Sequence, residues 1–339
     1  MRRIAIMTAG ADAPGMNAAI RSVARRSFEL GYDVLMVRDG FEGLVRGEIE
    51  IMNKKTVSGI LPLGGSILGS SRVSPEFAVQ NLAKIRGVLE SNSITTSIII
   101  GDRSAVAVAA VFDANSILCV VVPNTIDNDI FGTDFSIGFD SAITTISDAL
   151  DKLHSTASAH HRVMIVEVMG RQSGWLALYG GLAGGADFIA IPEQPVPIET
   201  LATHLKQRKE EGKDFSIVVV AEGYPIATHE PTLAGRPVAG YGLAEALANT
   251  TNLTIRVTVL GYLQRGGSPT VFDRLLATRL GLAAVNAVRE GKSGILVGEV
   301  GQRIAFTDLR EATTQPHVIP ADIVPVSYTH LTLPTIYSV

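Results

Sequence analysis

The 339-residue sequence lacks several features, and each absence excludes a class of protein. It has one cysteine, Cys119, so an internal disulfide is excluded, and the apolar residues around Cys119 indicate a core position in a reducing compartment. No apolar run reaches the length of a membrane span, and the run after the basic pair at residues 2–3 is too short for a signal peptide. We therefore expect a cytoplasmic protein with no membrane partner.

The sequence also lacks blocks of like charge. Its 29 Lys and Arg against 33 Asp and Glu give a formal net charge of −4. Because affinity for duplex nucleic acid rests on clustered Lys and Arg, nucleic acid is not an expected partner. What is present, 46% apolar residues, 18% charged residues and 33 glycines, is typical of a compact enzyme with tight turns. The length suffices for two domains or one large one.

Apolar β-branched runs alternate with stretches of helical periodicity, which predicts parallel sheets covered by helices on both faces, the α/β class. The expected strands are at residues 4–7, 33–37, 97–100, 118–122, 163–168, 188–191, 217–221 and 255–260. The expected helices are at residues 16–30, 104–112, 141–155, 175–183, 197–208, 243–248 and 272–289. Residues 321–339 have a different composition and could form a terminal strand, but we favour a non-native or disordered tail.

The most informative segment is the run from Pro123 to Asp129, which contains Thr125 and Asp127 and directly follows an apolar strand. The carboxyl edge of a parallel sheet is where open α/β proteins bind ligands. One carboxylate there suits a general base, and another suits a cation or a substrate hydroxyl. The alternative is a capped turn, because Asp, Asn and Thr are favoured before helices.

Three glycine-rich turns have the composition of phosphate-binding loops. Residues 10–17 join the first strand to the first helix, residues 64–72 end in Arg72, and residues 101–104 again connect a strand to a helix. Backbone amides and a helix N-terminus together attract anions. The first turn matches neither the P-loop nor the dinucleotide fingerprint, and an ordinary tight turn is the alternative. Asp102 in the third turn is either a Mg²⁺ ligand or a helix cap.

Arginines at the ends of strands complete the pattern. Arg162 and Arg171 bracket one strand, and Arg265 lies in a further glycine-rich turn. An arginine at a helix N-terminus opposes the helix dipole, so Arg171 needs an anion nearby or another reason to stand there. The histidines at positions 154, 160 and 161 lack a metal-ligand pattern. Amide-rich turns, arginines and a carboxylate cluster together predict phosphoryl transfer, which requires positioning and charge neutralisation.

The motifs resemble the 6-phosphofructokinase family from about Arg3 to Val285, and most strongly between Pro123 and Pro192. The matching motifs are Thr125–Asp129, Gly132–Asp134, Ile137–Asp140, Met169–Arg171, Ala183–Gly185 and Gln264–Pro269. The resemblance implies two similar three-layer α/β domains. Residues 1–138 and about 257–305 would bind the phosphoryl donor, and residues 139–256 would bind the sugar phosphate.

The resemblance implies transfer of phosphate from ATP, with Mg²⁺, to the 1-hydroxyl of fructose 6-phosphate in glycolysis. Asp127 is expected to be the base, with Thr125 and Asp129 beside it, and Arg171 is expected to neutralise the transferred group. The expected sugar-phosphate residues are Arg162, Met169, Gly170, Glu222, Arg256, Tyr262 and Arg265. The expected donor residues are Gly10, Ala11, Arg72, Val73, Gly101, Asp102, Arg103 and Ser104, with Asp102 as the metal ligand.

A homo-oligomer is also implied, because family members are commonly tetramers in which Arg162 and Arg256 reach a neighbouring subunit's site. Effector arginines of the family match Arg21 and Arg25, and Lys213 matches as well. Other effector positions are replaced or weakened, so we predict weak or absent effector control. These positions are Lys54, His154, Glu211 and Phe215.

The donor half departs from the family pattern at three positions. Ala11 replaces a glycine and would crowd a nucleotide, while Arg103 stands where ATP users have glycine and pyrophosphate users tend to have aspartate. At Asn124, glycine is usual with ATP and lysine with pyrophosphate. Two alternatives therefore stay open beside the ATP enzyme. One is a pyrophosphate-dependent phosphofructokinase, and the other is a catalytically impaired sugar-phosphate-binding subunit.

Overall fold

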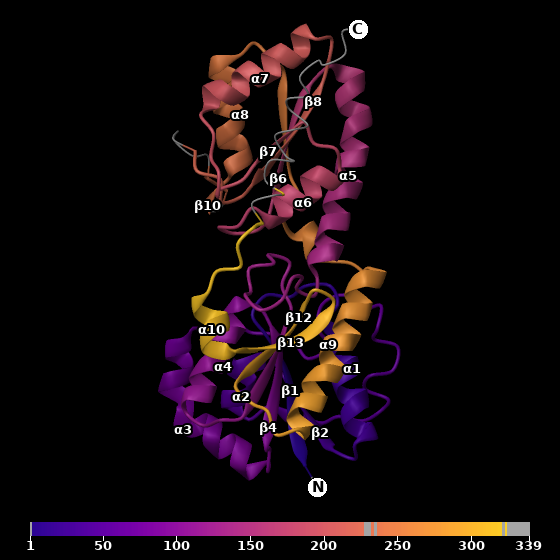
Figure 1. The fold of residues 1–339 in the computed structure, drawn as a ribbon, viewed down its shortest axis with the longest axis vertical. Coiled ribbons are helices and arrows are strands. Elements are labelled where there is room, and N and C mark those ends of the chain that lie inside the picture. The colour runs from indigo at the N-terminus through magenta and orange to yellow at the C-terminus, as the bar shows by residue number, and fades with distance from the viewer. Residues whose placement is uncertain (1, 227–231, 234–235, 321–322, 324–339) are drawn as a thin grey trace. The chain divides into compact units, whose positions relative to one another are not determined.

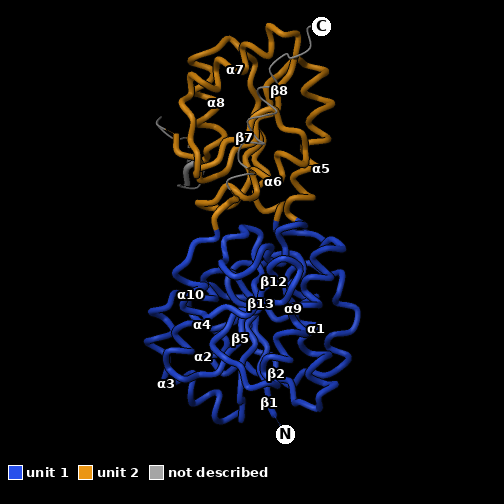
Figure 2. Tube along the Cα trace, viewed as in Figure 1, with its two compact units in different colours: residues 1–141, 265–317 blue, residues 142–264, 318–339 orange. Residues whose placement is uncertain are grey.

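The computed structural model describes residues 2–226, 232–233, 236–320 and 323. The described chain divides into two compact units, shown in Figure 2. The first unit runs to Ser141 and includes Arg265–His317, and the second contains Ala142–Gln264 and the described residues from Val318 onward. No helix in these ranges is both long and apolar enough to cross a membrane.

The first unit contains a seven-stranded sheet. Its strands are β1 (Arg3–Ala9), β2 (Asp33–Val37), β3 (Ile49–Ile51), β4 (Thr96–Gly101), β5 (Cys119–Pro123), β12 (Ile295–Val300) and β13 (Arg303–Asp308). They lie in the order β13-β12-β5-β4-β1-β2-β3. The inner five are parallel, and the edge strands β3 and β13 are antiparallel to their neighbours. Because β4 and β5 are central, their residues are buried on both faces of the sheet.

Helices cover both faces of this sheet (Figure 1). They are α1 (Met16–Glu29), α2 (Gly40–Arg46), α3 (Pro75–Ser91), α4 (Arg103–Ala114), α9 (Val271–Arg289) and α10 (Leu309–Thr314). Helices α1 and α9 pack on one face, while α2, α3, α4 and α10 pack on the other. Side chains of β1 alternate between these two cores, with Ile4 and Ile6 in one and Ala5 and Met7 in the other.

The second unit has a four-stranded parallel sheet, in the order β11-β6-β8-β7. Its strands are β6 (Val163–Val168), β7 (Phe188–Ala190), β8 (Ser216–Ala221) and β11 (Ile255–Val259). Its helices are α5 (Phe139–His160), α6 (Trp175–Ala183), α7 (Ile198–Glu210) and α8 (Ala239–Thr250). Smaller elements are β9 (Thr232–Leu233), β10 (Arg236–Pro237) and the 3-10 helix η1 (Gly261–Gln264).

The helices of the second unit also form two layers. Helices α7 and α8 share one apolar core with the sheet, and α6 approaches the opposite face, where Gly181 lies against Val219. Both units are therefore three-layer α/β structures with mainly parallel sheets, as the sequence predicts.

Several elements are missed by the sequence analysis. Helix α3 has only Ala78, Ile85 and Leu89 fully buried, so its apolar periodicity is weak. Strand β13 lies at a sheet edge and has no buried residue, which leaves little of the apolar signal that marks an inner strand. Helices α2 and α10 are too short for a periodic pattern to be recognised.

The unit boundaries differ from the predicted domain boundaries at residues 138, 257 and 305. Strand β11 pairs with β6, which keeps residues 257–264 in the second unit. The late segment of the first unit continues beyond residue 305, because β13 and α10 pack onto its sheet. The predicted tail at residues 321–339 lies outside the described residues, apart from Ile323.

Candidate active site

The turn that follows β5 holds the predicted catalytic residues of the first unit. Its two ends are joined, because Thr125 N donates to Ile137 O at 3.0 Å and Ile137 N donates to Pro123 O at 3.2 Å. The amide of Asp127 donates to Thr125 Oγ1 at 3.1 Å. Thr125 and Asp127 are each 1% exposed, and Asp129 is partly buried. No helix begins directly after these residues, so they do not cap a helix, but the bond of Asp127 N to the Thr125 hydroxyl is a side-chain cap of the turn, and the turn alternative describes part of this segment.

Asn128 lies between the two aspartates and determines the shape of the turn. Its φ of 49° is in the left-handed region, which asparagine tolerates better than most residues. Its Nδ2 donates to Asp134 O at 3.0 Å, and its Oδ1 accepts from Ser136 N at 2.8 Å. The sequence analysis includes Asn128 in a motif but gives it no role. Only the folded loop brings residues 134 and 136 back to it.

The first and third glycine-rich turns meet because β1 and β4 are neighbours, with Ala9 opposite Gly101. At Gly10, where φ is 87°, an added Cβ would lie 2.1 Å from Asp102 Oδ1. The amide of Ala11 donates to Asp102 Oδ2 at 3.0 Å. The two turns therefore have no space between them at this point, and glycine is required at position 10.

The second glycine-rich segment reaches the same place. Gly10 N donates to Ser71 O at 2.9 Å, and Arg72 donates to Asp102 Oδ2 at 3.0 Å. Val73 is buried beside these residues, in the core that includes Ala9 and Ala105. The structure thus brings together the predicted donor residues Gly10, Ala11, Arg72, Val73, Gly101, Asp102, Arg103 and Ser104.

Asp102 is the N-cap of α4. Besides Ala11 and Arg72, its carboxylate accepts from the amides of Ser104 and Ala105 and from the Ser104 hydroxyl. With 1% exposure and these donors, the carboxylate has little capacity left for a metal ion. The described residues also contain no group of three or more His, Cys, Asp or Glu that could hold a metal. Asp102 does not form a metal site by itself.

In the second unit, the residues after β6 and β8 lie together. Glu222 N donates to Val168 O at 2.9 Å, and Arg171 N donates to the Glu222 carboxylate at 2.6 Å. Gly170 and Arg171 have φ values of 131° and 55°. An arginine in the left-handed region is uncommon, and it is held there by the Glu222 contact. Met169, Gly170, Arg171 and Glu222 therefore share the carboxyl edge of this sheet.

Two further polar residues at this edge are not identified from the sequence. Gln264 is fully buried, accepts from Met169 N at 3.2 Å and donates to Gly261 O at 3.0 Å. Glu167 accepts from Gly240 N at 2.7 Å in the first turn of α8. Burial raises the pKa of Glu167, and the neighbouring Glu222 raises it further, against the lowering effect of the Gly240 bond. Gln264 belongs to the Gln264–Pro269 motif but is given no role from the sequence, and Glu167 lies in no quoted motif; the contacts of Gln264 with Met169 and of Glu167 with Gly240 join positions distant in sequence.

Comparison with known proteins identifies the family. The phosphofructokinase family model matches residues 3–288. The chain belongs to the phosphofructokinase family. An ATP-dependent 6-phosphofructokinase 1 of Thermus thermophilus is 43% identical over 313 residues, which cover 92% of this chain and 94% of that protein. A pyrophosphate--fructose 6-phosphate 1-phosphotransferase of Amycolatopsis mediterranei is 40% identical over 332 residues, covering 94% and 97%.

The fold agrees with a solved phosphofructokinase. The structure of phosphofructokinase from Saccharomyces cerevisiae superimposes with a TM-score of 0.84 at 32% identity and covers 92% of this chain. The match covers 44% of the yeast chain, so this chain spans less than half of its length. The resemblance inferred from the motifs is thus confirmed at the level of family and fold.

Not all residues expected from the phosphofructokinase pattern lie at this carboxyl edge. Arg162 precedes β6 and Arg256 is near the start of β11, whereas Met169 and Arg171 follow the end of β6. A strand rises about 3.3 Å per residue, so Arg162 lies about 20 Å from Met169. Arg265 belongs to the first unit, where its guanidinium donates to Asp12 O at 3.0 Å. Tyr262 is 76% exposed.

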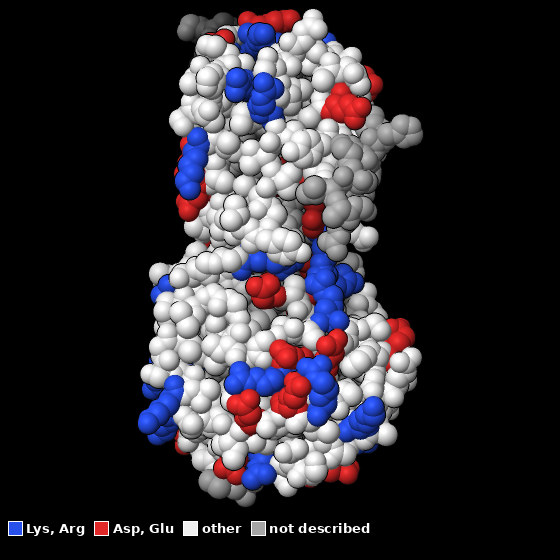
Figure 3. All heavy atoms as spheres, turned by 180° about the vertical axis from the view of Figure 1, so that it is seen from behind, with Lys and Arg blue, Asp and Glu red and all other residues white. Residues whose placement is uncertain are grey.

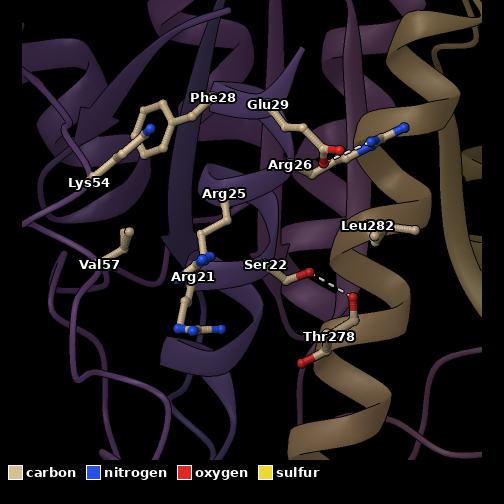
Figure 4. Close-up of a pocket in the computed structure, with 10 residues that line it drawn as sticks. All are labelled: Arg21, Ser22, Arg25, Arg26, Phe28, Glu29, Lys54, Val57, Thr278 and Leu282. Atoms are coloured by element: carbon tan, nitrogen blue, oxygen red, sulfur yellow. Dashed lines mark hydrogen bonds and ion pairs between the residues drawn. The ribbon is translucent and has the colours of Figure 1, made fainter. Parts of the chain in front are cut away.

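The effector arginines of the phosphofructokinase pattern line a cavity of about 470 Å³ in the first unit. Figure 4 shows Arg21 and Arg25 from α1 around it, together with Lys54 from the loop after β3 and Thr278 and Leu282 from α9. Lys213 belongs to the second unit. The predicted weakness of effector control stays a prediction.

On the molecular face in Figure 3, basic and acidic side chains are interspersed. Among the described residues, oppositely charged side chains pair at the surface around α2, where the Arg46 guanidinium contacts the carboxylates of Asp39, Glu42 and Glu48. This distribution agrees with the absence of like-charge blocks in the sequence.

Proposed function

We propose that this protein transfers a phosphoryl group from ATP to the 1-hydroxyl of fructose 6-phosphate, giving fructose 1,6-bisphosphate in glycolysis. The observation that carries the proposal is the shared edge of the first sheet. There the Asp127 turn after β5 lies beside the glycine-rich turns after β4 and β1, in a chain 43% identical to an ATP-dependent 6-phosphofructokinase. Both substrates are phosphorylated metabolites, so the proposal includes a cytoplasmic location.

In this reaction Asp127 removes the proton of the sugar hydroxyl. A base must be held within hydrogen-bond reach of that proton, and the buried, internally bonded turn restricts where Asp127 can move. Thr125 and Asp129 flank it as supporting polar groups. Arg171 neutralises charge that develops on the transferred phosphoryl group, as preorganised cations do in such transfers.

The first unit binds the donor and the second binds the sugar phosphate. The turns at residues 10–11 and 101–104, which meet at Asp102, lie at the donor end of the first sheet, and Arg72 beside them supplies positive charge for the donor phosphates. Mg²⁺ bound to the donor phosphates would neutralise part of their charge.

The site is completed by a second copy of the chain. Arg162 and Arg256 lie at the opposite end of the second sheet from Met169, Arg171 and Glu222, so one sheet edge cannot present all five to one sugar phosphate. In the proposed homo-oligomer, these two arginines serve the site of a neighbouring subunit.

Formation of fructose 1,6-bisphosphate from fructose 6-phosphate and Mg²⁺, measured in parallel with ATP and with pyrophosphate, tests the proposal. We expect turnover with ATP and a loss of about 10²- to 10⁴-fold in kcat for Asp127→Asn, the size of a general-base contribution. Turnover with pyrophosphate but not with ATP would mean that pyrophosphate is the donor. The Amycolatopsis relative at 40% identity supports this alternative.

The same assay tests the impaired-subunit alternative. Arg103 is exposed at the first position of α4, and Ala11 is partly buried, so neither is a core residue. We expect Ala11→Gly and Arg103→Gly to alter kcat and donor KM only modestly. Large gains from near-zero activity in both variants would mean that the donor half is impaired and that the protein binds its sugar phosphate without turnover.

A further inference from the structure

The end of the first unit's late segment lies against the turn that carries Asp127. After α10, the chain continues through Gln315 and Pro316 to His317, whose Nδ1 is 2.6 Å from the carbonyl oxygen of Asn128. The two residues are 189 positions apart in sequence. A carbonyl oxygen only accepts hydrogen bonds, so Nδ1 of His317 carries the proton and donates it.

We propose that His317 is a positioning residue for the phosphoryl transfer described above, acting through the carbonyl of Asn128. The inference rests on the proposed function. The Asn128 carbonyl belongs to the peptide that joins Asn128 to Asp129, so its direction determines how the chain leaves Asn128, the residue after Asp127, and enters Asp129. A donor aimed at that oxygen restricts the rotation of this peptide.

The other hydrogen bonds of the turn leave the Asn128–Asp129 peptide to be fixed by a donor from outside the turn. Asn128 is fully buried, so a carbonyl here without a donor would be costly. Its side chain is already bonded to Asp134 O and Ser136 N, and the Ser136 hydroxyl lies 2.7 Å from Thr125 O. These contacts fix the ends of the loop and the side chain of Asn128. They do not involve its carbonyl, which His317 satisfies.

The left-handed backbone of Asn128 strengthens the argument. A non-glycine residue at φ 49° persists only where its surroundings hold it. The loop is also attached to the β12–β13 hairpin, through Asp134 N to Glu299 O and Gly301 N to Asp134 Oδ2. His317, which lies after this hairpin in the same late segment, adds a further contact, and this contact is with the residue between Asp127 and Asp129.

Three variants test the proposal: His317→Ala, His317→Asn and Gln315→Ala. The alanine variant removes the donor, whereas the amide nitrogen of asparagine stands close to the place of Nδ1. Gln315 is exposed in the same segment and serves as the matched control. We expect His317→Ala to lower kcat about 10- to 100-fold with KM for fructose 6-phosphate changed less than about twofold, since misplacement of a reacting group acts on kcat. His317→Asn should recover most of the lost kcat, and Gln315→Ala should have the same kcat and KM as the unchanged chain.

Hydrogen–deuterium exchange of the peptide spanning residues 124–137 provides a readout that does not depend on activity. We expect faster exchange in His317→Ala, and near-normal exchange in His317→Asn and Gln315→Ala. If the unchanged chain shows no turnover with either donor, the proposed function fails and the positioning role fails with it, while the exchange result still decides whether His317 holds the Asn128 turn. Unchanged exchange and kcat in His317→Ala, or equal losses in the alanine and asparagine variants, would overturn the inference.

Discussion

Two aspartates at the same edge of the first sheet illustrate how residue environment separates their roles. Asp102 caps α4 and accepts from Ala11 and Arg72, so its carboxylate is engaged in holding the fold. Asp127 lies in a turn that leads into no helix for the next several residues. Residue type and strand-end location are the same for both. The local hydrogen bonds use Asp102 to anchor α4, and the proposed function assigns the chemistry to Asp127.

Asp273 offers a prediction at the residue scale. It is fully buried and accepts from Gly138 N and Ser141 N, each at 2.8 Å, and from the Ser141 hydroxyl. Burial raises its pKa from 3.8 to about 6, against the lowering effect of these hydrogen bonds. The folded state therefore favours the protonated acid. The contribution of Asp273 to the free energy of unfolding is therefore fully present below about pH 4 and is lost as the pH rises through about 6.

The measurement is the free energy of unfolding of the unchanged chain minus that of Asp273→Asn, between pH 4 and pH 8. We expect this difference to fall by about 2–3 kcal/mol in total as pH rises from 4 to 6, at up to about 1.4 kcal/mol per pH unit, and to stay level above pH 7. A difference that rises with pH over this range would contradict the assignment.

Helix α4 provides a prediction at the scale of elements, because it begins at the donor turn. Asp102→Ala removes the N-cap and leaves Arg72 without this partner, so we expect a loss of about 1–2 kcal/mol in unfolding free energy. Asp102→Asn keeps a capping oxygen and should retain most of the stability. If Asp102 also contacts the donor's Mg²⁺, the asparagine variant should still raise the donor KM severalfold.

Asp308→Ala is the matched control, since Asp308 caps α10 through Arg310 N and lies in none of the three donor turns. It should lose stability without a change in donor KM. Equal donor KM in Asp102→Asn and the unchanged chain would leave Asp102 with a capping role only.

Element boundaries also show which parts of the fold local sequence can predict. The strands 33–37 and 163–168 and the helix 175–183 are found at the predicted residues. They are apolar and enclosed by turn residues, so the pattern is strong. Helix α3 and strand β13 were missed, because an element with few buried residues carries little periodic signal.

At the scale of the whole molecule, the proposed shared site predicts complementation between two inactive variants. Chains with Arg162→Ala and chains with Asp127→Ala should each be nearly inactive. In a hybrid oligomer, one site at each interface combines an intact Asp127 with an intact Arg162 from the other chain. Hybrids can be purified by two different tags after co-expression. We expect about half of the sites at each interface between unlike chains to be active in them.

The control for this experiment pairs Asp127→Ala with Thr125→Ala. These residues lie on one turn of one chain, so their hybrids should not recover activity. Full activity of Arg162→Ala alone, or hybrids no more active than their parents, would rule out a shared site.

The sequence by itself determined the α/β class, the inner strands other than β12, and the family, because these depend on local periodicity and on short motifs in a fixed order. It also identified the residues at the ends of the strands, since parallel strands bring their carboxyl ends to one edge. Residues 10–11 and 101–104 were predicted as donor turns, and the structure brings them into contact.

Only the tertiary structure decided how those residues are used. The commitment of Asp102 to five hydrogen-bond donors, the left-handed Asn128 held by residues 134 and 136, and the contact of His317 with its carbonyl join positions far apart in the chain. The placement of Arg162 at the opposite end of β6 from Met169 likewise depends on the direction of a folded strand. The physical reason is that hydrogen-bond partners and burial are properties of the packed chain, and local sequence patterns do not specify them.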